Sequence, residues 1–436
     1  MNKIELVQLD TTTIQLIDGD RGINYPNKKD FLNEGYCLFL DSSNLTKNGF
    51  NFTSKAFINE KKDQEMGKGR LQRGDLVVNT RGTIGNIGLY TEDIPFEAVR
   101  INSGMLIIRG GADYDNKFLY FFLRSKLFFS QVEHLMSGSV QNQLPIWVMQ
   151  YIKLPKIDIN YQHKISNVLS AIDSKIELNN ETNAELEVMA KTIFDYWFVQ
   201  FDFPDENGKP YKSSGGKMIW NEEMKRKLPE LWEVNKINKY GDFKNGINYD
   251  PSLEGDTDAK IINVRNISSG TLFVSQYELD TITLKKENVD NYLVTGNDIL
   301  IARSGIPGAT RLMFEYAENT IYCGFIIRFQ VNTLANKYYL FYFLKGMEKN
   351  TTSKSGGTIL SNVNQDTLKR MDVVMPDNEL LIKFNEVVSS IFKIVNNNNK
   401  ENKYLSELRD WLLPMLMNDQ VQVADFTKEP TKVVVN

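Results

Sequence analysis

The second half of the chain repeats the first half, and this duplication limits the folds that the sequence can adopt. Five segments recur in the same order, at offsets that stay between 224 and 219 residues. The matching segments are GINY (22–25 and 246–249), DLVV and DILI (from Asp75 and Asp298), KFLYFFLR and YYLFYFLK (ending at Arg124 and Lys345), SGSV and GGTI (from Ser137 and Gly356), and IKLP and VVMP (ending at Pro155 and Pro376). Five collinear matches predict two similar modules in tandem.

Each half ends in a segment with the hydrophobic pattern of a long helix. The seam positions alternate steps of four and three residues, and the two seams match at an offset of 219. Such a stripe needs a partner helix, so we expect an antiparallel coiled coil with approximate two-fold symmetry. From Ile165 to Trp197 the seam would span about 48 Å as a rigid spacer. The positions expected to pair are Ile165, Leu169, Ile172, Ile176, Leu186, Ile193, Trp197, Phe384, Val388, Ile391, Val395, Leu405, Leu412 and Leu416.

Asparagines interrupt both seams near the middle, at Asn179 and Asn183 and at Asn398 and Asn402. In an antiparallel pair these polar sections would meet, and buried polar side chains in a seam can set the register. The alternative is that the Asn-rich segments break each helix into a helix-loop-helix, because asparagine is a poor helix former. The segments pair in either case.

The globular part of each half is expected to be mixed α/β. Short apolar runs, at 75–79, 105–109, 298–302 and 325–331, are typical of strands, and an aromatic helix follows them. The expected division is a first module at 1–157, a central long helix at 158–200, a connector at 201–231, a second module at 232–376, a C-terminal long helix at 377–417 and a flexible tail at 418–436. The connector is rich in Gly, Pro, Lys and Ser, which predicts irregular structure.

Composition excludes several classes of protein. Lys and Arg number 51 against 55 Asp and Glu, a net charge of -4, so any nucleic-acid contact must be local. The sequence has no run of 18 apolar residues and no signal peptide, which predicts a cytoplasmic protein. Its two cysteines are far apart and its two histidines lack a partner at ligand spacing, so no metal site is expected.

The sequence contains none of the common catalytic motifs. It has no phosphate-binding Gly-x-x-x-x-Gly-Lys-Ser/Thr, no Gly-x-Gly-x-x-Gly opening a βαβ unit and no Gly-x-Ser-x-Gly. The Asn/Asp-Pro-Pro-Tyr/Phe motif of amino-methyltransferases is also missing. The sequence therefore predicts a chain that is not catalytic by itself.

Polar loops that contain glycine recur after equivalent strands, as NTRGTIG at 79–85 and ARSGIPG at 302–308. A second pair, SGSVQNQ at 137–143 and SGGTILSN at 355–362, repeats the pattern. Arg, Asn, Gln, Ser and Thr can bond base edges and phosphates, although a plain solvated turn is the alternative for each loop alone. Two polar loops per module, found twice, favour DNA binding. The expected contacts are Asn79, Arg81, Thr83, Gln141, Asn142, Arg303, Ser304, Thr358 and Asn362.

Basic residues also gather before the first of these loops. A phosphate-facing strip is one interpretation, and an exposed charged hairpin is the other. The residues are Lys61, Lys62, Lys68, Arg70, Arg73 and Arg81.

Together these segments resemble the specificity subunit of Type I restriction-modification enzymes. The resemblance lies in GDLVVNTRGTIG, NDILIARSGIPG, the SGSVQNQLP segment and above all the run from Ala171 to Val234, which joins the central helix to the connector. It covers nearly the whole chain. It implies that each module is a target-recognition domain reading one part of an asymmetric, split DNA sequence, while the long helices set the unread gap.

The resemblance also implies partners that carry the chemistry. Two modification subunits would dock on this chain and methylate adenine at N6 with S-adenosylmethionine, and restriction subunits would add ATP- and Mg-dependent translocation and cleavage. This chain would need no cofactor of its own. The competing hypothesis is a coiled-coil scaffold that assembles partners without reading DNA.

Overall fold

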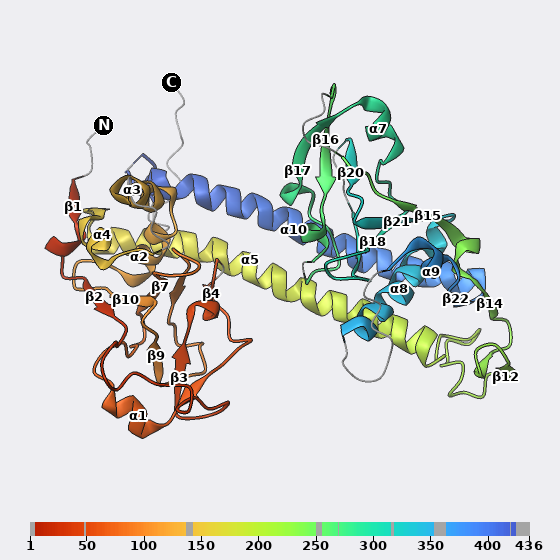
Figure 1. Cartoon of the computed structure of the whole chain (residues 1–436), viewed down its shortest axis with the longest axis horizontal. Helices are drawn as coiled ribbons and strands as arrows, with labels where there is room; N and C mark the ends of the chain where they lie inside the picture. The colour runs from red at the N-terminus through yellow and green to blue at the C-terminus, as the bar shows by residue number, and fades with distance from the viewer. Residues whose placement is uncertain are drawn as a thin grey trace, which may run out of the picture. The chain divides into compact units, whose positions relative to one another are not determined.

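The computed structural model describes residues 5–47, 49–136, 143–249, 255–268, 270–314, 318–352, 363–418 and 420–423. The chain forms two compact units (Figure 1): Met1–Leu178 joins Glu401–Asn436 in the first, and Asn179–Lys400 forms the second. The boundary cuts both long helices, so each unit contains one globular module and about half of each helix. The predicted segments treated the helices as separate bodies.

The first module contains a four-stranded antiparallel sheet and a smaller three-stranded sheet. The four-stranded order is β2 (Gln15–Asp18), β10 (Met105–Arg109), β7 (Leu76–Asn79), β8 (Ile87–Leu89). The three-stranded order is β6 (Phe57–Ile58), β3 (Cys37–Leu40), β9 (Val99–Ile101), with β3 and β9 parallel. Strand β1 (Leu6–Gln8) pairs with β11 (Lys153–Pro155), and β4 (Leu45–Thr46) with β5 (Gly49–Phe50). The helices are α1 (Glu60–Glu65), α2 (Asn116–Leu123), α3 (Lys126–Met136) and α4 (Ile146–Tyr151).

The second module repeats this topology, which confirms the predicted duplication and the mixed α/β class. Its four-stranded order is β15 (Gly241–Asn245), β21 (Ile326–Val331), β18 (Asp298–Ala302), β19 (Thr310–Leu312). Its three-stranded order is β17 (Asp280–Leu284), β16 (Thr257–Ile262), β20 (Thr320–Tyr322), with β16 and β20 parallel. Strand β14 (Glu233–Lys236) pairs with β22 (Asp372–Met375). The helices are α6 (Val264–Ile267), α7 (Lys286–Asn291), α8 (Lys337–Thr352) and α9 (Gln365–Lys369).

One of the five predicted matches is wrong, because the two GINY segments do not occupy equivalent positions. Asp18 faces Leu106, and Asn245 faces the equivalent residue Ile327, so Gly19 and not Gly22 corresponds to Gly246. A Cβ atom at Gly19 or Gly246 would lie 2.1 or 2.2 Å from a carbonyl oxygen of the opposite turn. Close backbone approach therefore explains a glycine at this position in both modules.

The two long helices run antiparallel inside each unit. Helix α5 (Ile159–Phe194) ends in a π-helical turn (Asp195–Val199), and α10 spans Asn378–Met417. In the first unit, Asp173 accepts from Arg409 at 2.6 Å, and Lys175 lies 3.3 Å from Glu401. In the second unit, the rings of Trp197 and Phe384 are 5.9 Å apart. The fourteen predicted seam residues are all buried or half-buried in the structure.

The asparagine sections are helical, so the helix-loop-helix alternative is wrong. In the second unit Asn183 donates to Asn399 at 3.0 Å and accepts from Asn398 at 2.9 Å. These side-chain hydrogen bonds offset the poor helix propensity of asparagine and favour one register. The sequence predicted this polar contact between the helices, which the pairing of Asn183 with Asn398 confirms, and Asn399 is a further partner that it did not predict.

The connector is folded, so the prediction of irregular structure for residues 201–231 is wrong. Strands β12 (Met218–Asn221) and β13 (Arg226–Pro229) form a hairpin, and the ring of Phe203 stacks on Tyr211 and Trp232 at 4.6 and 5.4 Å. This cluster joins the core at the end of α5. Val421 and Val423 of the expected flexible tail are instead held against α5, because the Tyr161 hydroxyl donates to the Val421 carbonyl and accepts from the Val423 N–H. Residues 424–436 lie outside the described residues.

An aspartate at the start of equivalent strands, Asp75 at β7 and Asp298 at β18, is stabilised differently in the two modules. In the first, Arg109 donates two hydrogen bonds of 2.7 Å to Asp75. In the second, Gln330 replaces this arginine, and the described cations near Asp298 are Arg328, at 3.8 Å, and Lys337. Burial raises the pKa of Asp298, and burial also lowers the pKa of Lys337 to about 8.

The low pKa of Lys337 predicts an alkaline gain in stability. Lys337 is 8% exposed, and its ammonium donates to the Gly296 carbonyl at 2.6 Å. Between about 8 and the ordinary value of 10.5, the unfolded chain holds a proton that the folded chain has lost, so stability rises with pH. We expect the unfolding free energy to increase by about 2 kcal/mol from pH 7 to 9.5 relative to Lys337→Met. Urea unfolding of both proteins measures this difference, and parallel pH profiles would contradict it.

Candidate nucleic-acid interface

The first polar loop of each module closes a hairpin of the larger sheet. Strand β7 leads through residues 80–86 into β8, and β18 leads through 303–309 into β19. The glycines that the sequence analysis noted have left-handed φ angles at matching positions: 74° and 82° at Gly82 and Gly85, 80° and 85° at Gly305 and Gly308. The two loops thus share one backbone conformation at an offset of 223, while their side chains differ.

The same backbone hydrogen bonds attach both loops to their surroundings. The Thr80 N–H donates to the Gly104 carbonyl at 2.9 Å, and the equivalent Arg303 N–H donates to the Phe325 carbonyl at 2.8 Å. The carbonyls of Thr80 and Arg303 in turn accept from Leu144 and Val363, which follow the second polar segment of each module. The two polar loops of a module therefore meet where the second segment ends. We name this region the loop edge of each module: residues 80–86 with Gly104 and Leu144 in the first, and residues 303–309 with Phe325 and Val363 in the second.

The predicted DNA contacts differ in their accessibility. Arg81 and Thr83 are exposed, and Arg303 and Ser304 are half-buried. No hydrogen bond or ion pair engages the guanidinium of Arg81 or Arg303 within the part of the chain that the structure describes. Since Arg81 aligns with Ser304 and Arg303 with Thr80, the two arginines occupy adjacent, not identical, loop positions. Four predicted contacts lie outside the described residues: Gln141, Asn142, Thr358 and Asn362.

Asn79 is not available for DNA in this structure, which corrects the prediction for this residue. Its side chain is fully buried, and its amide donates to the Ser42 carbonyl at 2.9 Å and to the Thr83 hydroxyl at 2.7 Å. The reason is that β7 continues to Asn79, so its side chain points into the packed module. Asn79 therefore holds the loop in place through its hydrogen bond to Thr83.

Sequence reasoning missed a third segment at each loop edge. A 3-10 turn (Ser42–Asn44) and the short helix α6 follow the buried strands β3 and β16, and both carry a capping box, from Asp41 to Asn44 and from Asn263 to Asn266. A Cβ at Gly82 would lie 3.5 Å from the Ser42 hydroxyl, and one at Gly305 would lie 2.9 Å from Val264. The Asx-x-x-Asn pattern after an apolar strand was the available signal.

Part of the basic strip makes internal contacts. Arg73 donates to the carbonyls of Thr91 and Ile94 at 2.6 and 2.9 Å and to the Glu97 carboxylate at 2.9 Å. Arg70 lies 3.2 Å from Asp63 but is exposed, as are Lys61 and Lys68. Arg73 is therefore structural, and Arg81 is the member of the strip at the loop edge.

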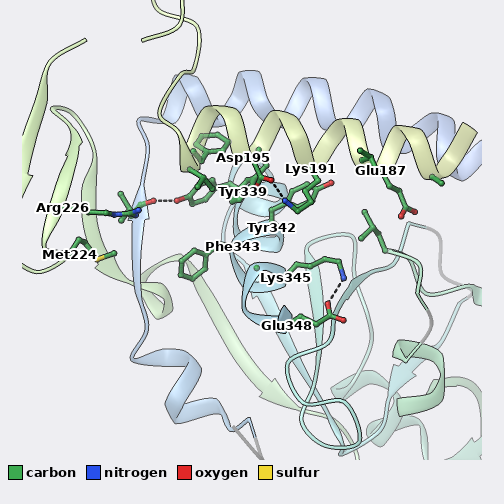
Figure 2. Close-up of a pocket in the computed structure, with 18 of the residues that line it drawn as sticks. Glu187, Lys191, Asp195, Met224, Arg226, Tyr339, Tyr342, Phe343, Lys345 and Glu348 are labelled. Atoms are coloured by element: carbon green, nitrogen blue, oxygen red, sulfur yellow. Dashed lines mark hydrogen bonds and ion pairs between the residues drawn. The ribbon is translucent and has the colours of Figure 1, made fainter. Parts of the chain in front are cut away.

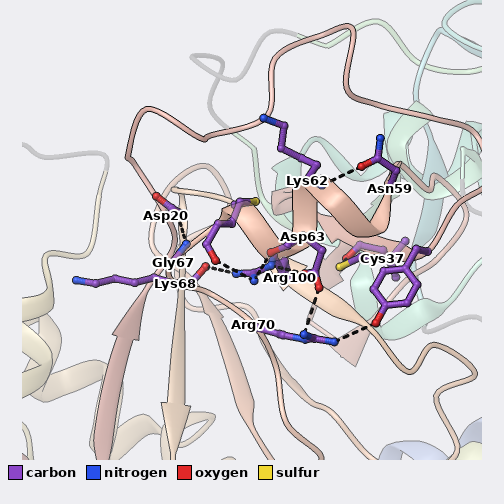
Figure 3. A network of polar contacts seen from close by, with 12 residues as sticks. Asp20, Cys37, Asn59, Lys62, Asp63, Gly67, Lys68, Arg70 and Arg100 are labelled. Atoms are coloured by element: carbon purple, nitrogen blue, oxygen red, sulfur yellow. Dashed lines mark hydrogen bonds and ion pairs between the residues drawn. The ribbon is translucent and has the colours of Figure 1, made fainter.

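A buried ionic network supports the smaller sheet of the first module (Figure 3). Arg100 on β9 forms an ion pair with Asp63 on α1 and donates to the carbonyls of Lys68 and Asp63 at 2.6 and 2.7 Å. Asp20 accepts from the N–H groups of Gly22 and Gly67 at 2.7 Å, and the backbone hydrogen bond from Gly22 is the main cause that lowers its pKa. The network ties α1 and the segment after it to the parallel strands, because Arg100 satisfies several carbonyls at once.

A groove of about 900 Å³ lies in the second unit between α5, α8 and the β18–β19 loop (Figure 2). Its lining mixes apolar side chains, among them Phe194, Tyr339 and Tyr342, with charged ones, and Ile306 of the loop contributes to it. Lys345 donates to Glu348 at 2.7 Å within it, and burial raises the pKa of Glu187. The groove therefore lies between the β18–β19 loop and the surface of a long helix.

Within the described ranges, no group of three or more His, Cys, Asp and Glu side chains is arranged to hold a metal ion. Among the helices of those ranges, none combines the length and apolar character needed to span a bilayer.

Two tandem modules with matching backbones and different loop side chains are typical of a protein with two related recognition domains. A family model described as the Type I restriction modification DNA specificity domain matches residues 19–188 and 222–408. Since these matches cover most of the chain, it belongs to this family and is a DNA sequence-specificity subunit of the Type I restriction-modification class.

Two specificity subunits are similar in sequence to this chain over most of their length. The Type I restriction enzyme MjaIX specificity subunit of Methanocaldococcus jannaschii is 23% identical over 379 residues, covering 84% of this chain and 82% of the relative. The HindI specificity subunit of Haemophilus influenzae is 23% identical, covering 92% and 98%. The crystal structure of a Type I restriction-modification S subunit from M. genitalium has a TM-score of 0.52 at 16% identity, covering 95% and 97%. This structural similarity supports the fold.

Proposed function

We propose that this chain reads an asymmetric, two-part DNA target, one part with each loop edge, and takes no catalytic part in the reaction. The observation that carries the proposal is that the two loop edges share their backbone and hydrogen bonds but differ in side chains. Two loop edges with the same backbone would bind DNA in the same orientation, because contacts to the phosphate backbone of DNA set the orientation of a protein. Their different side chains would select different bases.

We further propose that two modification subunits dock on this chain and supply methylation with S-adenosylmethionine, and that restriction subunits supply ATP- and Mg-dependent cleavage. The long helices offer surface for docking, since Val188 and Met189 on α5 and Tyr404 and Trp411 on α10 are exposed apolar side chains. Partners would also add positive charge, because the chain alone carries a net charge of -4.

Footprinting of the reconstituted complex separates this function from that of a scaffold. Two protected patches with an unprotected gap are expected if the modules read DNA. Uniform protection on every sequence, with the complex still assembled, would favour the scaffold. Incubation of this chain alone with DNA, S-adenosylmethionine, ATP and Mg tests the non-catalytic role, which methylation or cleavage without partners would contradict.

Arg81→Ala and Arg303→Ala are expected to relax specificity separately in the two target parts. A bidentate arginine–guanine contact discriminates by about 1–3 kcal/mol, which corresponds to roughly 5- to 150-fold. Sequencing of methylated DNA after treatment with each variant complex measures the preference at every target position.

Lys156→Ala and Lys236→Ala are the matched controls for this pair, because each removes an exposed lysine that pairs with Glu5 or Asp372 on the same module. All four variants should assemble with the modification subunits. Unchanged preference in both arginine variants would remove these residues from base recognition.

A further inference from the structure

The loop edge of the second module carries an exposed aromatic side chain that the sequence analysis had assigned to a strand. Strand β21 begins at Ile326, and Phe325 precedes it in the turn after β20. Its side chain is 59% exposed. The turn is held on both sides, because the Gly324 N–H donates to the Ile247 carbonyl at 2.7 Å and the Ile326 N–H to the Cys323 carbonyl at 2.9 Å. The phenyl ring is therefore displayed from a well-held backbone.

Phe325 lies directly beside a predicted DNA contact. Its carbonyl accepts the hydrogen bond from the Arg303 N–H, so the two residues are neighbours on adjacent segments of the loop edge. The carbonyl of Arg303 in turn accepts from Val363 at 3.3 Å, at the end of the second polar segment. An apolar ring and a guanidinium thus share the region that would face the bases.

The first module shows that the fold does not need this ring. Gly104 occupies the equivalent position, since its carbonyl accepts from Thr80 as that of Phe325 accepts from Arg303. A Cβ at Gly104 would lie 3.3 Å from Oδ1 of Asn102, which is a tight contact, and 3.6 Å from the Cβ of Arg81, so the first module has less room at this position and offers no side chain there. Isolated exposed apolar residues are common on proteins, but this one distinguishes two otherwise matching loop edges.

We propose that Phe325 contacts the C5-methyl group of a thymine in the target part read by the second module. This inference rests on the proposed DNA-reading function. The thymine methyl is the apolar group that base pairs present in the major groove, and apolar side chains, Phe among them, recognise it by contact. Removing that surface from water favours binding to thymine over a base that lacks the methyl group.

Replacing thymine with deoxyuridine tests the contact atom by atom, because the two bases differ only by the methyl group. The target is first read from the methylated sequences, and each thymine of both strands is then replaced singly in duplexes bound by the reconstituted complex. With the unmodified chain, one substitution in the second target part should weaken binding about fourfold, the value of one buried methyl-sized group. With Phe325→Ala the thymine duplex should bind about as weakly as the deoxyuridine duplex, and the difference between them should vanish.

Leu334→Ala is the matched control, since Leu334 is 56% exposed on the same module but lies beyond the far end of β21. It should keep the fourfold difference. If the complex binds a specific target and Phe325→Ala retains the full thymine preference, or no thymine methyl of the second part matters, the inference is overturned while the proposed function stands. Equal binding to all sequences by the unmodified complex would overturn both.

Discussion

Asp63→Ala is expected to unfold or strongly destabilise the first module, with a loss of about 3–5 kcal/mol in unfolding free energy. Asp63 is 0% exposed, and its carboxylate pairs with Arg100, which is itself 4% exposed. Removing the carboxylate leaves a buried guanidinium whose charge is no longer compensated, which costs more than the pair contributes when intact. Hydrogen exchange should show lost protection in β3 and β9 but not in β16 and β20.

The effect of Asp63→Ala on DNA recognition should also be confined to the first module. A complex with Asp63→Ala should lose discrimination at the first part of the target and keep it at the second. Glu60→Ala is the control, because Glu60 is exposed on the same helix, and its effect should stay within about 0.5 kcal/mol. A loss below 1 kcal/mol for Asp63→Ala would mean that the network contributes little to the module.

Phe384→Ala is expected to cost the second unit about 3–5 kcal/mol, because it removes a fully buried ring from the helix pair. The ring of Phe384 lies 4.8 Å from Phe198 and 5.9 Å from Trp197 on the other long helix. The cavity would open where α5, α8 and α10 share one core, so the surrounding rings have little freedom to collapse into it. Urea unfolding, with hydrogen exchange to assign the loss to this unit, measures the effect.

Ile394→Ala provides the comparison on the same helix, since Ile394 is 48% exposed and lies outside the seam. Its unfolding free energy should change by less than about 0.5 kcal/mol. Comparable losses in the two variants would show that the seam does not supply the stability of this pair.

The duplication and the helical seam were readable from the sequence because both are periodic. Seam positions such as Val388 and Leu416 follow from heptad spacing alone, and the structure buries both. The folded connector was not readable in this way. Phe203, Tyr211 and Trp232 are spaced without period, so only their contact in three dimensions shows that they form a cluster.

At the loop edge, too, some features were readable from the sequence and others only from the structure. Glycine punctuation located the hairpins, because a turn with positive φ favours glycine wherever it occurs. The strand end at Asn79 was predicted correctly, but the inward position of its side chain depends on contacts with Ser42, which is distant in sequence, and with Thr83. The exposure of Phe325 depended on β21 beginning one residue later than expected.

By itself, the amino-acid sequence determined that this protein has two related modules, two long pairing helices and polar hairpins after matching strands, because repetition and periodicity are properties of order along a chain. Only the tertiary structure decided which polar groups are consumed inside the modules, as with Asn79 and Arg73, and which remain available at the loop edges, as with Arg81, Arg303 and Phe325. Burial and hydrogen bonding are set by residues distant in sequence, so the availability of a side chain for DNA is a property of the folded molecule.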